Sequence, residues 1–285
     1  MIEVEDLPEL RRPIVVAAFE GWNDAGEAAS SVIAHLADVW GAEAVAAVDP
    51  EDYYDFQVNR PRVGPHEGIR RITWPTTRIL LARDTGFDHD VLLVQGIEPS
   101  MRWRAFVIEL LTLAHEVDAE LLVCLGALLA DVPHTRPCPV FTTAEDPELI
   151  ERYGLEESTY EGHTGILGVL ADAAHQSDLP CVSSWVSVPH YAGGHNSPKA
   201  TLALLNALES LLDLALPHGD LEDLSRAWER GVDELAGSDE EIGEYVQALE
   251  SAQDTADRPE ASGDAIAAEF ERYLRRRGND QQQGG

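Results

Sequence analysis

The 285-residue chain contains little lysine and little cysteine. Its one lysine is Lys199, and its cysteines are Cys124, Cys138 and Cys181. Three cysteines do not provide a disulfide framework, and Cys124 and Cys181 lie in apolar runs where a free thiol behaves as a small apolar group. This usage fits a reducing compartment, and we expect a cytoplasmic protein.

Long apolar runs are also missing from the chain. No run is long enough to span a bilayer. Residues 1–6 lack the basic region and the apolar segment of a signal peptide. We therefore expect no membrane partner.

Positive charge is scarce, because 52 acidic residues stand against 20 lysines and arginines and give a net charge of -32. Nucleic-acid backbones and anionic membrane surfaces would be repelled by such a protein, so we expect no nucleic-acid partner. A solvated acidic surface explains most of this charge. A basic protein partner is the more specific alternative.

Apolar strand-like runs alternate with helix-like runs over most of the chain. This alternation predicts an α/β fold, in which a mostly parallel, mixed sheet lies between two layers of helices as an α/β/α sandwich. The segment 69–82 contains two strand-like pieces split at Trp74–Thr77, which predicts a hairpin or a sheet edge. The strand-like runs are 14–19, 44–48, 78–82, 90–95, 121–125 and 181–188, and the helix-like runs are 25–40, 103–117, 164–175 and 198–216.

The pattern changes after Pro217–Asp220, where strand-like runs stop. Two apolar stripes at helical spacing, separated at Gly237–Asp239, predict an acidic helical hairpin. We expect an α/β domain over 1–217, an acidic helical extension over 218–277, including a last helix over 264–277, and a disordered tail over 278–285.

The turn after the first predicted buried strand carries polar residues, with the sequence Phe19-Glu20-Gly21-Trp22-Asn23-Asp24-Ala25-Gly26. In open α/β sheets, ligands usually bind at such strand ends. Glu20 and Asp24 could act as acid and base or bind a cation. Helix capping by Asn23 or Asp24, with Glu27 completing a capping box, is the alternative explanation.

Two later segments point to the same edge of the sheet. Glu98 stands before Pro99 at the end of another strand-like run, where it could meet Glu20 or form a salt-bridged corner. The glycine-rich stretch 162–168 leads into a helix, whose free N–H groups could bind an anion. Close packing of helix on sheet explains these glycines equally well.

Histidines occur in two predicted loops. A strand is expected to end at Gly126, and His134 and Arg136 follow it, where they could bind an anion or cap carbonyl groups. His190 and His195 flank a glycine-rich turn, but no cysteine or carboxylate completes a metal site nearby. Gly-x-Ser-x-Gly and His-Glu-x-x-His motifs are absent from the sequence, and we expect no metal and no cofactor.

The order and spacing of four segments resemble the PAC2 family of proteasome assembly chaperones, in particular its actinobacterial branch. The resemblance implies a body similar to the purine nucleoside phosphorylase fold, self-association, with a trimer favoured, and a chaperone role in assembling the 20S proteasome. It implies no catalytic residues. The sequence ends at 280–285 without the hydrophobic-Tyr-x tail of ring-docking factors, which argues against docking through the C-terminus. The four segments are 19–26, 96–99 with Trp103, 162–168, and 190–200 with His190-Tyr191 and Asn196-Ser197-Pro198-Lys199-Ala200.

Three functional hypotheses follow. The first is a non-enzymatic assembly factor that acts through protein–protein interfaces. The second is a small-molecule-binding protein or enzyme, phosphorylase-, hydrolase- or ligase-like, with a pocket at the carboxyl ends of the strands. The third is a scaffold whose acidic hairpin recruits a basic partner. The candidate pocket or interface residues are Glu20, Trp22, Asn23, Asp24, Glu98, Gly162, Thr164, Gly165, Tyr191 and Asn196.

Overall fold

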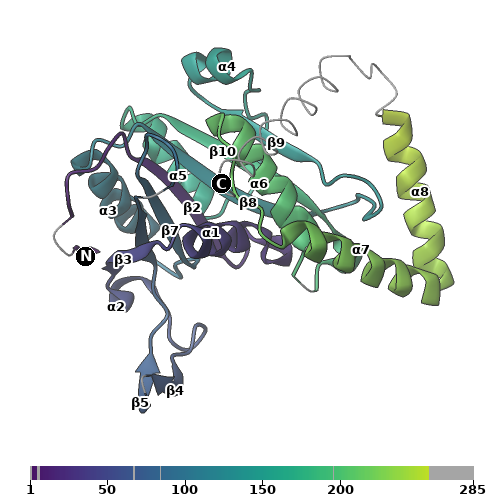
Figure 1. Ribbon diagram of the computed structural model, residues 1–285, viewed down its shortest axis with the longest axis horizontal. Helices are drawn as coiled ribbons and strands as arrows, with labels where there is room; N and C mark the ends of the chain where they lie inside the picture. The colour runs from purple at the N-terminus through teal and green to yellow at the C-terminus, as the bar shows by residue number, and fades with distance from the viewer. Residues whose placement is uncertain (1, 5–6, 67, 84, 195, 257–285) are drawn as a thin grey trace, which may run out of the picture.

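The fold is built on one large sheet with helices on both faces (Figure 1). The computed structural model describes residues 2–4, 7–66, 68–83, 85–194 and 196–256. The sheet has eight strands in the order β1-β3-β6-β7-β2-β8-β10-β9. Their bounds are Ile2–Val4 for β1, Ile14–Glu20 for β2, Glu43–Val48 for β3, Arg78–Ala82 for β6, Val91–Ile97 for β7, Leu121–Ala130 for β8, Val140–Ala144 for β9 and Cys181–Pro189 for β10.

The centre of the sheet is parallel. Strand β2 pairs in parallel with β7 and β8, and β8 pairs in parallel with β10. The pairs toward the two edges, which involve β1, β3, β6 and β9, are antiparallel. Parallel neighbours need long crossover connections, and helices provide them here. The prediction of a mixed, mostly parallel sheet is confirmed.

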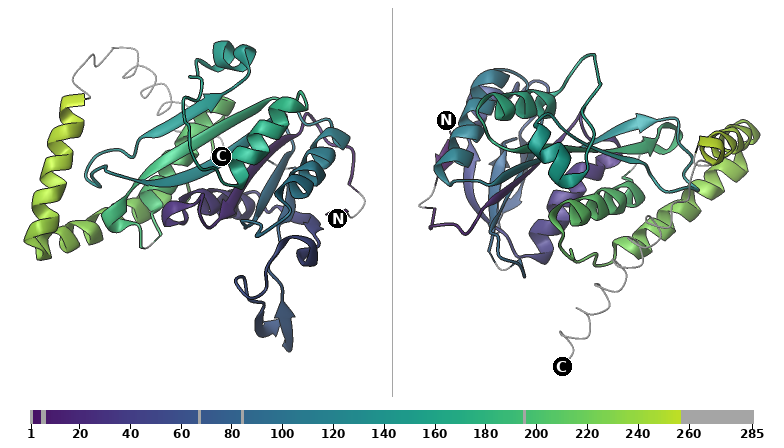
Figure 2. Two further views of the ribbon diagram at one scale, coloured as in Figure 1. Left: turned by 180° about the vertical axis from the view of Figure 1, so that it is seen from behind. Right: turned by 90° about the horizontal axis from the view of Figure 1, so that it is seen from above.

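Four helices form the outer layers. Helices α1 (Ala28–Val39) and α6 (Pro198–Leu212) cover one face of the sheet, and α3 (Trp103–Glu116) and α5 (Ile166–Gln176) cover the other (Figure 2). Strand β2 is buried on both sides, because its successive side chains point to opposite faces. Ile14, Val16 and Ala18 pack in the core under α1 and α6, and Val15, Ala17 and Phe19 pack under α3 and α5.

The structure corrects the predicted strand end at Gly126. Strand β8 continues through Gly126 to Ala130. The residue inside the strand is a glycine because the Trp185 ring of β10 lies over it. A Cβ at this position would come within 2.5 Å of a ring carbon. Helix α6 is also shorter than predicted, since the left-handed backbone of Asp213 (φ 52°) ends it. Short elements that the sequence did not indicate are α2 (Pro50–Tyr53), β9, and α4 (Pro147–Tyr153).

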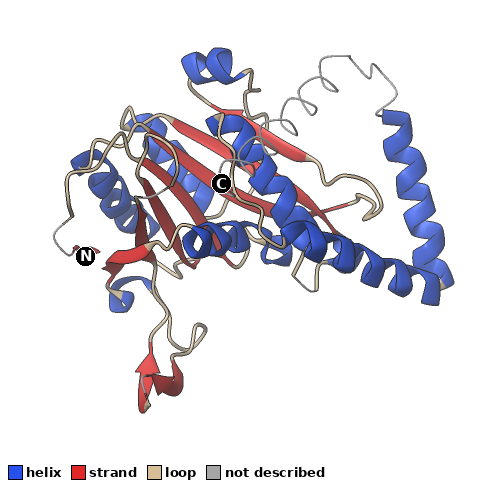
Figure 3. Cartoon of the chain, viewed as in Figure 1, coloured by secondary structure: helices blue, strands red, loops and turns tan. Residues whose placement is uncertain are grey.

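The two strand-like pieces of 69–82 belong to different sheets. Strand β6 lies inside the main sheet between β3 and β7, so its prediction as a sheet edge is wrong. Strand β5 (Ile69–Thr73) pairs antiparallel with β4 (Arg62–His66), not with β6. Strand β4 was not predicted from the sequence, because Gly64 and Pro65 are residue types that disfavour a strand. Strands β4 and β5 form a ribbon that projects from the body (Figure 3), and we call the described residues 62–66 and 68–73 the arm.

The C-terminal part of the described chain contains the two predicted acidic helices. Helix α7 (Leu221–Ser238) packs on α6, and α8 (Glu240–Ala256) follows after a sharp turn (Figure 1). None of the described helices is long and apolar enough to cross a membrane. The domain boundary at 217 stays a prediction. The predicted helix 264–277 and tail 278–285 lie outside the described residues.

Candidate functional site

The turn between β2 and α1 places Asp24 beneath the start of a helix. A short 3-10 turn, Ala25–Glu27, precedes α1. The buried Asp24 carboxylate accepts hydrogen bonds from the backbone N–H of Ala29 (2.7 Å) and of Ser30 (3.3 Å). Burial raises the pKa of Asp24, and these hydrogen bonds oppose that shift. Asp24 therefore caps the helix as predicted, although it stands three residues before the formal N-cap.

The predicted capping box with Glu27 is wrong. Glu27 itself occupies the N-cap position of α1, has a left-handed backbone (φ 50°) and makes no capping hydrogen bond with its side chain. The inserted 3-10 turn shifts the frame of the helix, so Glu27 does not reach the N3 position that a capping box needs.

Glu98 joins three segments that are distant in the sequence. Its Oε1 accepts hydrogen bonds from the side-chain amide of Asn23 (2.7 Å) and from the backbone N–H of Ile166 (2.8 Å), the first residue of α5. Its own N–H donates to the carbonyl oxygen of Glu20 (2.9 Å). The predicted meeting of the Glu20 and Glu98 segments at the carboxyl ends of the parallel strands is therefore observed.

The same contacts explain one glycine of the 162–168 stretch. A Cβ at Gly165 would lie 2.2 Å from Oδ1 of the fully buried Asn23, so only glycine fits without movement. We call Asn23, Asp24, Glu98, Gly165 and Ile166 the strand-end cluster. Both of its carboxylates accept hydrogen bonds at helix N-termini, where the helix dipole favours negative charge.

Glu20 lies beside this cluster but is exposed. Partial burial and the neighbouring carboxylates of Asp24 and Glu27 raise the pKa of Glu20, and Arg62 opposes that shift. Glu20 thus has the environment of a titratable surface acid, and its side chain is not part of the hydrogen bonds that join the three segments.

The remaining predicted residues are less tightly gathered. Trp22 is 63% exposed, and Gly162 and Thr164 are exposed as well. Asn196 is exposed next to Ser197, whose N–H donates to the carbonyl oxygen of Gly26 (2.8 Å). The fourth predicted segment therefore reaches the β2–α1 turn through its backbone.

Tyr191 faces a different set of partners. Its hydroxyl accepts a hydrogen bond from the backbone N–H of the buried His134 (2.7 Å) and lies 2.8 Å from Nδ1 of the same residue. His134 Nε2 lies 3.0 Å from Oδ1 of Asp233 in α7. Nearby, the Lys199 ammonium donates to Glu229 (2.9 Å). We call His134, Tyr191, Lys199, Glu229 and Asp233 the helix junction.

Burial raises the pKa of Tyr191 to about 12, so the phenol is neutral at pH 7 and keeps its proton for donation. The Tyr191 hydroxyl is assigned as the donor to Nδ1 of His134. Nε2 of His134 then carries the ring proton and donates it in the hydrogen bond to Asp233. Sequence reasoning singled out His134 and Tyr191 separately. Their link to Asp233 was missed because His134 and Asp233 are 99 residues apart.

Helix α8 is held to the body by a second group of polar contacts. The Arg136 guanidinium donates to both carboxylate oxygens of Asp254 (2.8 and 2.9 Å), and the Tyr245 hydroxyl donates to Asp131 (3.0 Å). Arg136, predicted to bind an anion or cap a carbonyl, thus binds a carboxylate of this same chain. Within the described residues no group of histidines, cysteines and acids could hold a metal ion.

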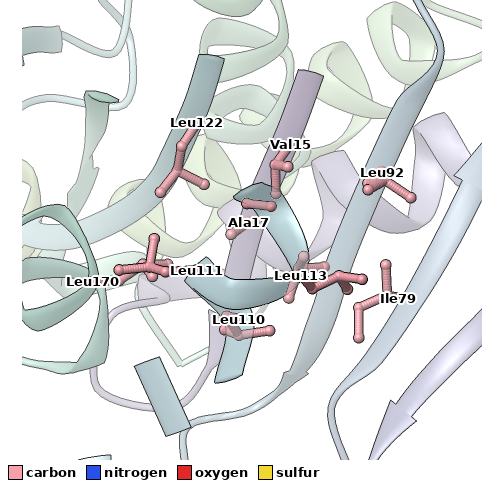
Figure 4. Close-up of a pocket in the computed structure, with 11 residues that line it drawn as sticks. Val15, Ala17, Ile79, Leu92, Leu110, Leu111, Leu113, Leu122 and Leu170 are labelled. Carbon is pink, nitrogen blue, oxygen red and sulfur yellow. The ribbon is translucent and has the colours of Figure 1, made fainter. Parts of the chain in front are cut away.

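A small cavity of about 20 Å³ lies in the apolar core (Figure 4), and no residue of the strand-end cluster lines it. Apolar side chains of β2, β7 and α3 line it, among them Val15, Leu92 and Leu110. Such a cavity offers no polar group to orient a ligand, so it is a packing gap under α3 and not the predicted strand-end pocket.

The model of the PAC2 family matches residues 18–236. This chain belongs to the PAC2 family. A PAC2 family protein from Streptomyces avermitilis is 56% identical, with a TM-score of 0.78, and the match covers 82% of this chain and 99% of the other. No curated protein matches the chain.

Two solved structures from Mycobacterium tuberculosis extend the comparison. A proteasome-assembly chaperone homologue is 47% identical, with a TM-score of 0.74, over 82% of this PAC2 chain and 99% of the other. A protein of unknown function is 28% identical, with a TM-score of 0.80, over 90% of this chain and 91% of the other. The resemblance seen in the sequence is therefore confirmed at the level of the family.

Proposed function

We propose that this PAC2 protein is a non-enzymatic, cytoplasmic assembly factor that binds subunits of the 20S proteasome through protein–protein interfaces and needs no cofactor. The strand-end cluster carries the proposal. Asp24 and Glu98 accept hydrogen bonds at the starts of α1 and α5, as acids that stabilise a rigid corner do. The 47% identity to a proteasome-assembly chaperone homologue adds to this support.

Trp22, next to the strand-end cluster, is the residue that we expect to contact a partner. It is 63% exposed, and its neighbours Asn23 and Asp24 are fixed by buried hydrogen bonds. A large aromatic side chain on a rigid backbone is the kind of residue that dominates binding energy at protein interfaces. Self-association, with a trimer favoured, belongs to the same proposal, because a repeated corner could contact several ring subunits at once.

Co-expression of the tagged full-length chain with proteasome α and β subunits from the same organism tests the proposal. We expect α subunits to be recovered with the tag, and unassembled α subunits on native gels to become fewer. Trp22→Ala should reduce recovery about tenfold, whereas Ile108→Ala, which removes an equally exposed apolar side chain from α3, should not. Failure to recover any α subunit at low and moderate salt would overturn the proposal.

A further inference from the structure

The arm is a ribbon that projects from the body, away from the main sheet (Figures 1 and 3). Val63, Ile69 and Ile72 are each more than half exposed, and all five residues of β5 are exposed. A two-stranded ribbon on its own is only marginally stable in water, and exposed apolar clusters mark interaction surfaces. The arm therefore has the character of a segment that is completed by a partner.

The arm also has the opposite charge to the rest of the molecule. From 62 to 73 the sequence contains three arginines and a single acid, Glu67, in a chain whose net charge is -32. Arg70 and Arg71 are exposed, and neither forms an ion pair within the described residues. A basic, apolar arm calls for an acidic partner with some exposed apolar surface.

The pairing of the strands distributes these groups over both faces of the arm. Val63 is opposite Ile72, and Pro65 is opposite Arg70, so these four residues share one face. Arg71 lies on the other face with Ile69, two positions earlier in the strand. Each face thus combines an arginine with a β-branched apolar residue.

A surface with the complementary character exists on this same chain. From 221 to 256 the sequence has eleven acidic residues against two arginines. At the turn between α7 and α8, the exposed acids Glu234, Glu240, Glu241 and Glu244 lie close in the sequence to the exposed Leu235. We call these five residues the acidic corner.

The arm and the acidic corner project from different sides of the body in Figure 1 and in the reverse view of Figure 2. One molecule therefore does not bring its own arm to its own corner. Two different patches that fit each other make a head-to-tail contact between copies, and such contacts build a ring where the rotation between copies closes and an open filament where it does not.

We propose that the arm of one copy docks on the acidic corner of the next copy, so that Arg70 meets the corner's acids, Val63 and Ile72 on the same face cover Leu235, and Arg71 on the opposite face adds to the positive charge of the arm. The proposal rests on the self-association proposed above and not on the proteasome role. It assigns the two surfaces that join successive copies, and it makes association sensitive to salt.

Light scattering coupled to gel filtration, at several protein concentrations, tests the contact on the full-length chain. The variant Arg70→Glu/Arg71→Glu should weaken self-association about tenfold or more, and Glu240→Arg/Glu244→Arg should do the same. The matched control, Arg104→Glu/Arg152→Glu, makes the same change in net charge on exposed helix positions and should associate like the wild type. The chain that carries both the arm and the corner substitutions should recover association.

Each outcome decides the proposal. Recovery in the combined variant supports the contact, because only direct opposition of the two surfaces predicts it. If the arm variant associates as the wild type does, the docking is wrong while self-association stands. If the arm variant dissociates and the combined variant does not recover, the acidic corner is not the acceptor. A wild type that is monomeric at all concentrations would overturn both this inference and the proposed self-association, and leave proteasome binding to its own test.

Discussion

The strand-end cluster and the helix junction are both polar and partly buried, but their charged side chains have different kinds of hydrogen-bond partners. In the strand-end cluster, carboxylates accept hydrogen bonds from backbone N–H groups at helix N-termini, and the Asn23 amide completes the set. In the helix junction, side chains of α7 pair with side chains of the body, and Asp233 is 57% exposed. The strand-end cluster is built into the turns that follow the central parallel strands. The helix junction fastens α7 to the body from outside.

This difference predicts unequal energetic costs. Backbone donors that lose a buried acceptor stay unpaired, because the helix cannot turn them elsewhere. A side chain near the surface can replace a lost partner with water. We therefore expect substitutions in the strand-end cluster to lower the stability of the whole domain, and substitutions in the helix junction to loosen α7 alone.

Glu98→Ala should have the largest effect. It removes the acceptor of the fully buried Asn23 amide and of the Ile166 N–H, and should lower the free energy of unfolding by about 3 kcal/mol. Chemical denaturation measures the change. Glu20→Ala, which removes an exposed acid from the adjacent strand end, is the control and should cost less than about 0.5 kcal/mol. Equal effects of the two variants would contradict the structural role of Glu98.

Asp24→Ala should cost about 2 kcal/mol at pH 7, the upper range for a lost helix cap. Its pH dependence has a definite sign. Burial raises the pKa of folded Asp24 above the unfolded value, so the folded state takes up the proton first as the pH falls. The stability that Asp24 contributes must therefore increase from neutral pH toward 3.8, and then level off.

Denaturation curves of the wild type and of Asp24→Ala at several pH values measure this difference. The cost of the substitution should grow as the pH is lowered through the folded pKa. Asp38→Ala, which removes an exposed carboxylate from the other end of α1, should cost less than about 0.5 kcal/mol at pH 7. A cost of Asp24→Ala that shrinks with falling pH would mean that Asp24 is stabilised as an anion.

The same comparison explains which parts were predictable from the sequence. The buried strand β2, the polar turn after it and the helix start at Pro198 each carry local signals, namely branched apolar runs, capping residues and a proline at the first helical position. The 3-10 turn before α1 shifted the cap without leaving a local signal. Gly126 was misjudged because the Trp185 ring that requires it lies in another strand.

The strand-end cluster could be predicted in outline, because the carboxyl ends of parallel strands lie on the same side of the sheet. Once the fold class is known, this rule brings the Glu20 and Glu98 segments together. Tyr191 was expected there as well, on its position after β10. It turns instead to His134, whose loop begins only after Ala130, where β8 ends. Only the pairing of remote loops decides that orientation, and single-sequence patterns do not encode it.

Asp233→Ala should have the smallest effect, less than about 1 kcal/mol of global stability, because Asp233 is exposed and water can take its place as the acceptor for the buried His134 Nε2–H. The local effect should be clearer. Hydrogen exchange should accelerate in α7 and remain unchanged in β2 and β8, since α7 depends on this contact and on Lys199–Glu229 for its polar attachment. Arg230→Ala, at an exposed position of α7 outside the helix junction and the acidic corner, is the control and should leave exchange in α7 as it is. A global loss as large as that of Glu98→Ala would mean that the helix junction is as integral to the fold as the strand-end cluster.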